Sequence, residues 1–203
     1  MKITISGSLG NVSKPLAKKL VASGHEVTVI SSSSDRSEAI KALGAKPAIG
    51  SVSDVLFLEK AFAGADAVYV MTPPNMGGSN ILANMTEAGN AFAKAIKNSG
   101  IKRVVMLSSI GADLPNGTGP IAGIYNIEKI YETLENTSIT FLRAGFFYTN
   151  FYHDVPIIKG AGIIGANYSA RNCSSLRASG RYCDCRCRRI RKNRIRNKCS
   201  LYC

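Results

Sequence analysis

Cysteine is absent from the first 168 residues of this 203-residue chain, and no apolar run reaches the length of a membrane-spanning helix. The absence of cysteine leaves the cellular compartment open. The start of the chain leads directly into a strand, without the apolar stretch that follows the basic start of a signal peptide. We therefore expect no membrane partner and a cytoplasmic location.

Residues 169–203 lack valine, phenylalanine, methionine, proline and glutamate, yet they hold all six cysteines and a formal charge of +10. Residues 1–168 carry only +3 of the total charge of +13, so a strongly basic surface is not a property of the body. High cationic density with few apolar residues is typical of disorder. We predict one domain over 1–168, followed by a disordered basic tail over 169–203.

Short β-branched runs alternate with amphipathic stretches along the body. The pattern predicts strands over 2–6, 26–31, 46–50, 66–72 and 103–109, and helices over 13–24, 54–64 and 80–99. This alternation favours the α/β class, as a doubly wound Rossmann-like parallel sheet with helices on both faces. Such sheets bind ligands outside the carboxyl ends of their strands, so the loops after the strands are the candidate site.

The loop after the first strand reads GSLGNVSK, residues 7–14. Gly7 allows a sharp turn and Gly10 a close backbone approach, while the following helix presents N–H groups and a positive dipole end to an anion. The loop resembles the GxxGxxG loop of the short-chain dehydrogenase superfamily, with Ser13 in place of the third glycine. We predict dinucleotide binding here, with a plain turn as the alternative; the candidate contacts are Gly7, Leu9, Gly10, Asn11 and Val12.

The second strand ends in VISSSSDRS, where folds that bind NAD normally have a carboxylate. The hydroxyls of Ser31 and Ser32 and the forked cation of Arg36 suit the 2′-phosphate of NADP better than a free ribose diol. We therefore predict NADP(H) as the cofactor. The acidic Asp35 is less suited to a phosphate, so NAD(H) stays as an alternative. A polar loop with a helix cap is the other interpretation of this segment.

Candidate contacts also follow the next two strands. Asp54 is placed to contact the adenine amino group or to cap the helix that begins after it, and capping is favoured. Thr72 and Pro73 come where a proline pair stops a strand, and they are candidates for a wall beside the cofactor.

Three segments of the second half carry a more specific resemblance: RVVMLSSIGA, YNIEKIYETLE and ITFLRAGFFYTNF. In order and spacing they are similar to the NmrA-like branch of the atypical short-chain dehydrogenases, which includes NADPH-dependent quinone reductases. The resemblance covers residues 1 to about 165 and departs from the family at Ala144, where proline is usual. It implies hydride transfer from NADPH to a small-molecule substrate, a quinone or similar carbonyl. It also implies a C-terminal substrate lobe, which is missing here or replaced by the basic tail.

In the wider superfamily a serine and a YxxxK pair share the chemistry, and the resemblance assigns these roles to Ser109, Tyr125 and Lys129. Tyr125 and Lys129 share a helix face because they are four residues apart, and a nearby ammonium favours the phenolate of a tyrosine. By resemblance Ser109 binds the substrate oxygen, and Lys129 also holds the nicotinamide ribose. The alternative is a solvated helix face, since Glu128 and two further glutamates surround the pair, and many relatives lack the tyrosine.

The tail admits several interpretations. Its six cysteines lack the paired CxxC of structural zinc sites, so we predict no metal. Its nine arginines suit phosphate contacts, but an abrupt change in composition at one residue is what translation in a shifted reading frame would produce. We favour that origin over an evolved nucleic-acid arm. A non-catalytic NAD(P)-sensing regulator is the alternative function, and the substrate, the activity of this chain and the oligomeric state stay open.

Overall fold

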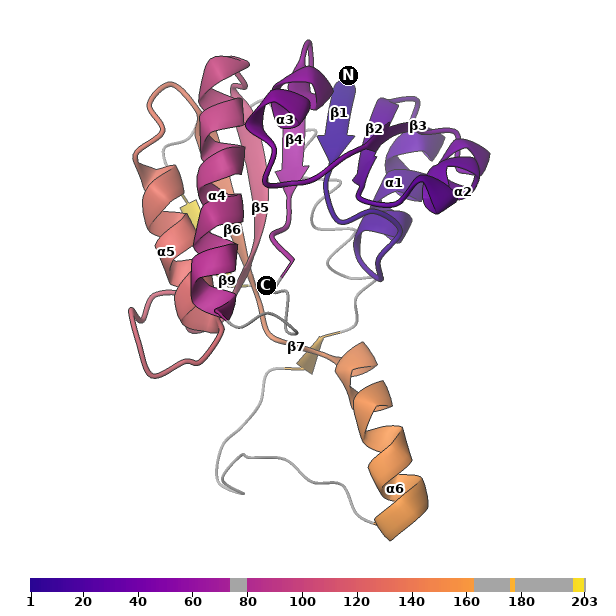
Figure 1. Cartoon of the computed structure of the whole chain (residues 1–203), viewed down its shortest axis with the longest axis vertical. Coiled ribbons are helices and arrows are strands. Elements are labelled where there is room, and N and C mark those ends of the chain that lie inside the picture. The colour runs from indigo at the N-terminus through magenta and orange to yellow at the C-terminus, as the bar shows by residue number, and fades with distance from the viewer. Residues whose placement is uncertain (74–79, 163–175, 178–198, 203) are drawn as a thin grey trace.

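The computed structural model describes residues 1–73, 80–162, 176–177 and 199–202 (Figure 1). Its main sheet is parallel throughout, with the strand order β3-β2-β1-β4-β5-β6-β9. The strands are β1 (Lys2–Ile5), β2 (Glu26–Ser31), β3 (Lys46–Ile49), β4 (Ala67–Val70), β5 (Arg103–Ser109), β6 (Ser138–Ala144) and β9 (Cys199–Tyr202). The predicted doubly wound parallel sheet is confirmed. Pro47, which lacks an N–H for pairing, lies in the edge strand β3.

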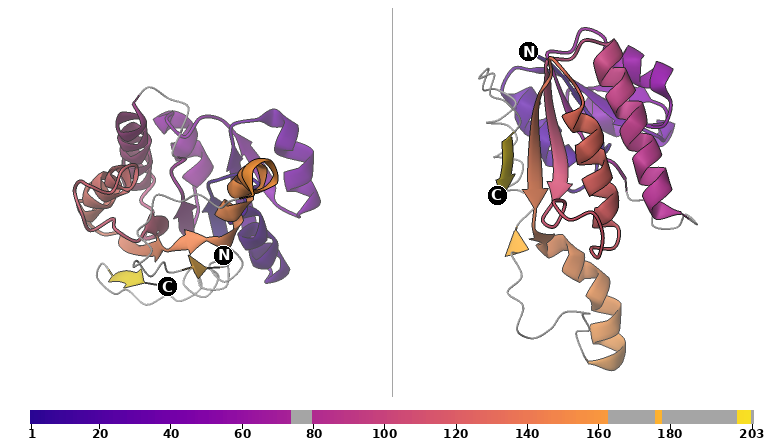
Figure 2. Two further views of the ribbon diagram at one scale, coloured as in Figure 1. Left: turned by 90° about the horizontal axis from the view of Figure 1, so that it is seen from below. Right: turned by 90° about the vertical axis from the view of Figure 1, so that its left-hand side faces the viewer.

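Helices cover both faces of this sheet (Figures 1 and 2). Side chains of α1 (Ser13–Ala22) and α2 (Ser37–Ala42) pack into one buried cluster with β1 and β2. Side chains of α3 (Val55–Phe62), α4 (Ile81–Asn98) and α5 (Ile121–Glu132) pack into a second cluster on the other face. None of the described helices combines the length and the apolar composition that crossing a bilayer requires.

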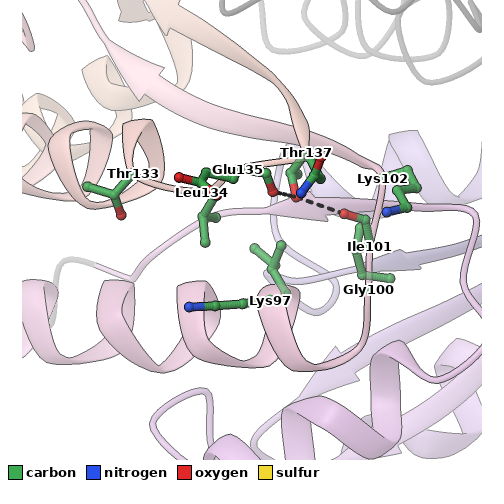
Figure 3. Close-up of a pocket in the computed structure, with 10 residues that line it drawn as sticks. Lys97, Gly100, Ile101, Lys102, Thr133, Leu134, Glu135 and Thr137 are labelled. Atoms are coloured by element: carbon green, nitrogen blue, oxygen red, sulfur yellow. Dashed lines mark hydrogen bonds between the residues drawn. The ribbon is translucent and has the colours of Figure 1, made fainter.

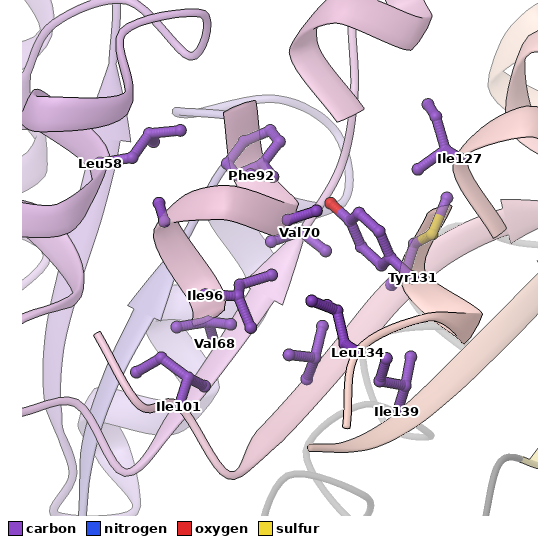
Figure 4. Close-up of a cluster of buried hydrophobic side chains, with 14 of the residues drawn as sticks. Leu58, Val68, Val70, Phe92, Ile96, Ile101, Ile127, Tyr131, Leu134 and Ile139 are labelled. Atoms are coloured by element: carbon purple, nitrogen blue, oxygen red, sulfur yellow. The ribbon is translucent and has the colours of Figure 1, made fainter. Parts of the chain in front are cut away.

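The second cluster is the larger of the two and joins α4 and α5 closely (Figure 4). The apolar stripe predicted for 80–99 is buried there, with Met85 and Phe92 at most 2% exposed. Asn80 caps α4, because its side-chain oxygen accepts a hydrogen bond from the Ala83 N–H at 3.0 Å. Gly89 is required where the helices cross, since a Cβ there would lie 2.6 Å from Ile127 Cγ1.

The carboxyl edge of the sheet carries further chain. In Figure 1 the arrowheads of β1 and β4 point toward β7 (Phe146–Phe147), and α6 (Val155–Ala161) extends from that edge away from the sheet. The short 3-10 helix η2 (Tyr148–Asp154) connects β7 to α6. Phe146 and Phe151 pack edge to face, with ring centroids 5.3 Å apart.

Two short pieces of the basic tail lie within the described residues, and both are strands. β8 (Leu176–Arg177) pairs with β7, and β9 extends the main sheet beside β6. Strand pairing uses backbone groups, so these two pieces need no apolar periodicity to pair. The rest of the tail, including five of its six cysteines, lies outside the described residues.

Candidate functional site

Loops from four strands meet at the carboxyl edge of the sheet. Because β1, β2, β4 and β5 are parallel neighbours or near neighbours, their carboxyl ends share one edge (Figures 1 and 2). The candidate residues 7–12, 31–36, 72–73 and 109 all follow or end these strands. The fold therefore brings these candidate residues to one edge from separate parts of the chain, whereas Tyr125 and Lys129 lie on α5.

The glycine loop makes a tight turn between β1 and α1. Gly7 and Ser8 both have positive φ, of 92° and 51°, and the Gly10 N–H donates to the Gly7 carbonyl at 3.1 Å. A Cβ on Gly7 would collide with Ser13 Oγ and lie 2.8 Å from Met71 Cε. The turn leads into the first turn of α1, where the Lys14 N–H donates to the Gly10 carbonyl at 3.0 Å and the Leu16 N–H donates to the Val12 carbonyl at 3.3 Å. A tight glycine turn that leads from a strand into a helix is typical of loops that bind the pyrophosphate of a dinucleotide.

Ser13 stands where the superfamily loop has its third glycine, and its side chain is built into the fold. Ser13 is only 1% exposed, and its hydroxyl donates to the Ser6 carbonyl at 2.8 Å. The Ser6 hydroxyl in turn accepts from the Met71 N–H at 2.7 Å and donates to the Met71 carbonyl at 3.1 Å. The serine thus replaces close glycine packing with a hydrogen bond that fixes α1 to the end of β1.

The serines at the end of β2 differ in burial. Ser31 is buried, and its hydroxyl accepts from the Ser8 hydroxyl at 3.0 Å and donates to the Ser33 carbonyl at 3.1 Å, so it ties the glycine loop to β2. Ser32 and Arg36 are exposed, and Arg36 forms no ion pair within the described residues. Asp35 bonds to Ser33 as part of the cap of the 3-10 helix η1 (Ser34–Arg36).

Asp54, Thr72 and Pro73 occupy the ends of the next strands. Asp54 caps α3, since its carboxylate accepts from the Phe57 N–H at 3.2 Å, as the sequence favoured. Thr72 is buried and Pro73 is exposed, directly after β4. Pro74, the second proline of the pair, lies outside the described residues.

The YxxxK pair lies on α5, with Tyr125 half-buried and Lys129 exposed. The Lys129 ammonium sits 5.5 Å from the centroid of the Tyr125 ring and 3.0 Å from Glu132 Oε2. The Glu132 hydrogen bond and charge raise the pKa of Lys129 above its ordinary value of 10.5. The lysine therefore faces the ring of Tyr125 and a carboxylate, in contrast to the lysine–phenol arrangement that the resemblance implies.

Ser109 ends β5 on the face that α5 does not cover. Met106 packs in the cluster under α4 and α5, whereas Leu107 packs against the cluster under α1 and α2. Since side chains alternate along a strand, Ser108 shares the face of Met106 and Ser109 that of Leu107. The Ser109 hydroxyl donates to the Ile110 carbonyl at 3.1 Å. The structure thus turns Ser109 away from the helix that carries the YxxxK pair.

The interpretation of the glutamates as a solvated face is wrong for Glu128, which is only 2% exposed. Its carboxylate accepts from Arg143 Nε at 3.1 Å, from Arg143 Nη2 at 2.7 Å and from the Ser108 hydroxyl. Helical spacing turns Glu128 toward the sheet because it lies three residues before the buried Tyr131, on the same face of α5. The sequence carried one signal of this cluster, an arginine inside the apolar strand SITFLRA, since a buried charge requires a partner.

The pocket drawn in Figure 3 lies at the opposite edge of the sheet. Its lining comes from the turns that lead from α4 into β5 and from α5 into β6, and it has a volume of about 350 Å³. The two turns are joined by a hydrogen bond, since the Thr137 hydroxyl donates to the Ile101 carbonyl at 3.0 Å. Among the described residues, no group of three or more His, Cys, Asp or Glu side chains is arranged to hold a metal.

Known proteins match this chain at the level of family and fold. An NAD(P)H azoreductase from Xenophilus azovorans is 25% identical over 162 residues, which are 79% of this chain and 53% of the azoreductase. The structure of an NADPH-dependent quinone oxidoreductase from Escherichia coli in complex with NADPH matches with a TM-score of 0.81 and 19% identity, over 99% of this chain and 68% of that one. The structure of a triphenylmethane reductase from Citrobacter sp. with NADP(H) matches with a TM-score of 0.64 and 19% identity, over 78% and 55% of the two chains.

These likenesses confirm the expected similarity to NADPH-dependent quinone oxidoreductases in the fold, and the chain spans about half the length of the azoreductase. The sequence profile of the NAD(P)H-binding family matches residues 7–144, which run from the glycine loop to the end of β6. The match includes the glycine loop after β1 and the carboxyl ends of β2, β4 and β5. The chain therefore belongs to the NAD(P)H-binding family.

Proposed function

We propose that this chain is the cofactor-binding part of an oxidoreductase that passes hydride from NADPH to a quinone or a similar carbonyl compound. The observation that carries the proposal is the convergence of the family's glycine loop with the ends of β2, β4 and β5 at one edge. The azoreductase and quinone oxidoreductase matches support a reductase with an aromatic or quinonoid acceptor. In the net reaction NADPH, a proton and a quinone give NADP⁺ and a hydroquinone.

The residues divide into three roles in this proposal. The glycine loop and the first turn of α1 hold the pyrophosphate, with Gly7, Gly10 and the backbone of residues 9, 11 and 12. Ser32 and Arg36 contact the 2′-phosphate, because both are exposed beyond the buried Ser31. Thr72 and Pro73 form the wall next to the nicotinamide, and Lys129 binds its ribose.

Titration of NADPH and NADH against the intact chain tests the cofactor assignment. NADPH is expected to bind more tightly, and Arg36→Ala is expected to weaken NADPH alone by about 1.5–3 kcal/mol, the value of one charge-assisted contact. Lys41→Ala is a control, since it removes a neighbouring surface cation that is paired with Glu38. Equal affinities for the two cofactors would contradict the role given to Arg36 and Ser32.

A second function, a non-catalytic NAD(P) sensor, is favoured by the geometry of the YxxxK pair. Lys129 contacts the face of the Tyr125 ring and Glu132, and Ser109 faces away from α5. The rate of quinone reduction by NADPH, measured for the parent chain and for the Tyr125→Phe variant, separates the two functions. Turnover that falls with Tyr125→Phe assigns the proton donor, unchanged turnover leaves Tyr125 out of the chemistry, and tight NADPH binding without turnover of any quinone supports the sensor.

We include two further points in this proposal: residues 1–168 form the functional domain without the tail 169–203, and the protein works in the cytoplasm. The cofactor edge uses β1, β2, β4 and β5, whereas β9 lies beyond β6 at the far side of the sheet and β8 pairs with β7 outside the main sheet. Removal of residues 169–203 is therefore expected to leave NADPH affinity unchanged. Sequencing of the encoding DNA after the Tyr168 codon tests the origin of the tail, because a shifted frame should encode further apolar helices and strands.

A further inference from the structure

A buried ionic cluster lies beneath the candidate site and has no role in the function proposed above. Glu128 of α5 takes two hydrogen bonds from Arg143 of β6 and one from Ser108 of β5. Ser108 and Arg143 are direct partners in the parallel register of β5 and β6, so both side chains rise from the same place on the sheet. The cluster therefore joins one helix to two adjacent strands.

Stability alone is a weak reason for such a cluster. The side chains of Arg143 and Glu128 are 11% and 2% exposed, and the desolvation of two charges offsets most of their attraction. Apolar residues of the same volume would hold α5 on the sheet about as well, as Ile127 does on the same helix. Unlike apolar contacts, the fork of an arginine on a carboxylate accepts only one geometry.

The cluster is also adjacent in sequence to the groups at the candidate site. Glu128 precedes Lys129, and Ser108 precedes the last residue of β5. Arg143 precedes Ala144, whose carbonyl accepts from the Ile110 N–H at 2.8 Å where the loop after β5 begins. Rotation of α5 about its axis would move Lys129 and break the Glu128 contacts together.

We infer that Glu128, held by Arg143 and Ser108, is a positioning residue that fixes the rotation of α5 and so directs Lys129 to the ribose of bound NADPH. The inference rests on the proposed ribose contact of Lys129. Arg143 acts as the anchor on the sheet, and its Nη1 lies 3.9 Å from Asp113 in the loop between β5 and α5. The cluster thereby connects that loop, the helix and both strands.

The test separates positioning from stability with two kinds of variant. The double variant Glu128→Leu/Arg143→Met removes both charges of the pair and leaves no buried charge unpaired, since Asp113, the other contact of Arg143, is half-exposed. It is therefore expected to keep the free energy of unfolding close to that of the parent chain. Its NADPH affinity is expected to fall about tenfold, as for Lys129→Ala, because α5 is no longer fixed in rotation. Ser108→Ala keeps the ion pair and is expected to fold with an intermediate loss of about threefold. Glu38→Gln, at an exposed ion pair on α2, is the matched control.

A double-mutant cycle provides the deciding result. In a chain that carries Lys129→Ala, the cluster variants are expected to cause no further loss of NADPH affinity. Cluster variants that bind NADPH like the parent chain, or whose losses add fully to that of Lys129→Ala, would overturn the inference while the proposed ribose contact stands. If Lys129→Ala itself leaves affinity unchanged, the ribose contact fails and the inference fails with it. Should the double variant not fold, Ser108→Ala alone decides the same question by the same cycle.

Discussion

Replacement of Tyr131 by phenylalanine should stabilise this protein. Tyr131 lies on α5 with no exposed surface, and within the described residues its hydroxyl has no hydrogen-bond partner. Figure 4 shows the ring among apolar side chains, with the oxygen directed toward Phe92 and Val70. A buried hydroxyl without a partner costs about 1–3 kcal/mol. Replacement by phenylalanine removes the hydroxyl, and with it this cost, and keeps the rest of the side chain.

The expected gain is smaller than the full cost, because the missing oxygen leaves a small void. A void of methyl size costs about 1 kcal/mol, and the void left by a hydroxyl is no larger. The net increase in the free energy of unfolding is therefore about 1 kcal/mol, which corresponds to a rise in Tm of roughly 2–4 °C for a chain of this size. Urea unfolding followed by circular dichroism measures it.

Alkaline pH gives an independent signature of the same group. Burial raises the pKa of Tyr131 above its ordinary value of 10.0. Above that value the unfolded chain loses the Tyr131 proton and the folded chain keeps it, so stability falls as pH rises. Tyr131→Phe should remove this part of the alkaline loss.

Tyr152→Phe makes the same chemical change at a residue that is 74% exposed, and it should alter the free energy of unfolding by less than about 0.5 kcal/mol. A loss of more than about 1 kcal/mol in Tyr131→Phe would show that the hydroxyl is satisfied and would refute the argument.

Three further predictions concern the cofactor edge. Gly7→Ala should abolish NADPH binding and cost about 1–3 kcal/mol of stability, because φ is 92° and the new Cβ would collide with Ser13. Gly64→Ala, which has φ of 70° and open space around it, should cost only the backbone strain and leave NADPH binding intact. The affinity for NADPH should stay level from about pH 7.5 to 9.5, because Lys129 stays protonated there: its ordinary pKa is 10.5, and Glu132 raises it further. A decline in this range would mean that another group carries the contact. Glu132→Gln removes the partly exposed carboxylate that pairs with Lys129, and NADPH affinity by isothermal titration should stay the same or become up to about threefold tighter. A tenfold loss would assign Glu132 itself to the cofactor.

Local rules explain why most of the fold could be predicted from the sequence. The stripe of Met85 and Phe92 and the cap at Asn80 define α4 without knowledge of its neighbours, since helical periodicity and capping act within a few residues. The glycine loop was predictable for the same reason, because Gly7 adopts a backbone that other residues rarely take. Alternation of strands and helices then required a doubly wound sheet, and that required the loops to meet at one edge.

Only the tertiary structure decided which polar side chains are available at that edge. Ser31 and Ser32 are equivalent in sequence, yet Ser31 is buried and bonded to Ser8 from another loop, whereas Ser32 is exposed. Glu128 looks like a surface residue until the register of β5 and β6 places Ser108 and Arg143 beneath it. Such pairings join residues far apart in the chain, and their energies depend on burial and angle, which no local pattern encodes. The sequence by itself determined a dinucleotide fold with its loop at the carboxyl edge, and the packing of α5 on the sheet decided which charges that edge presents.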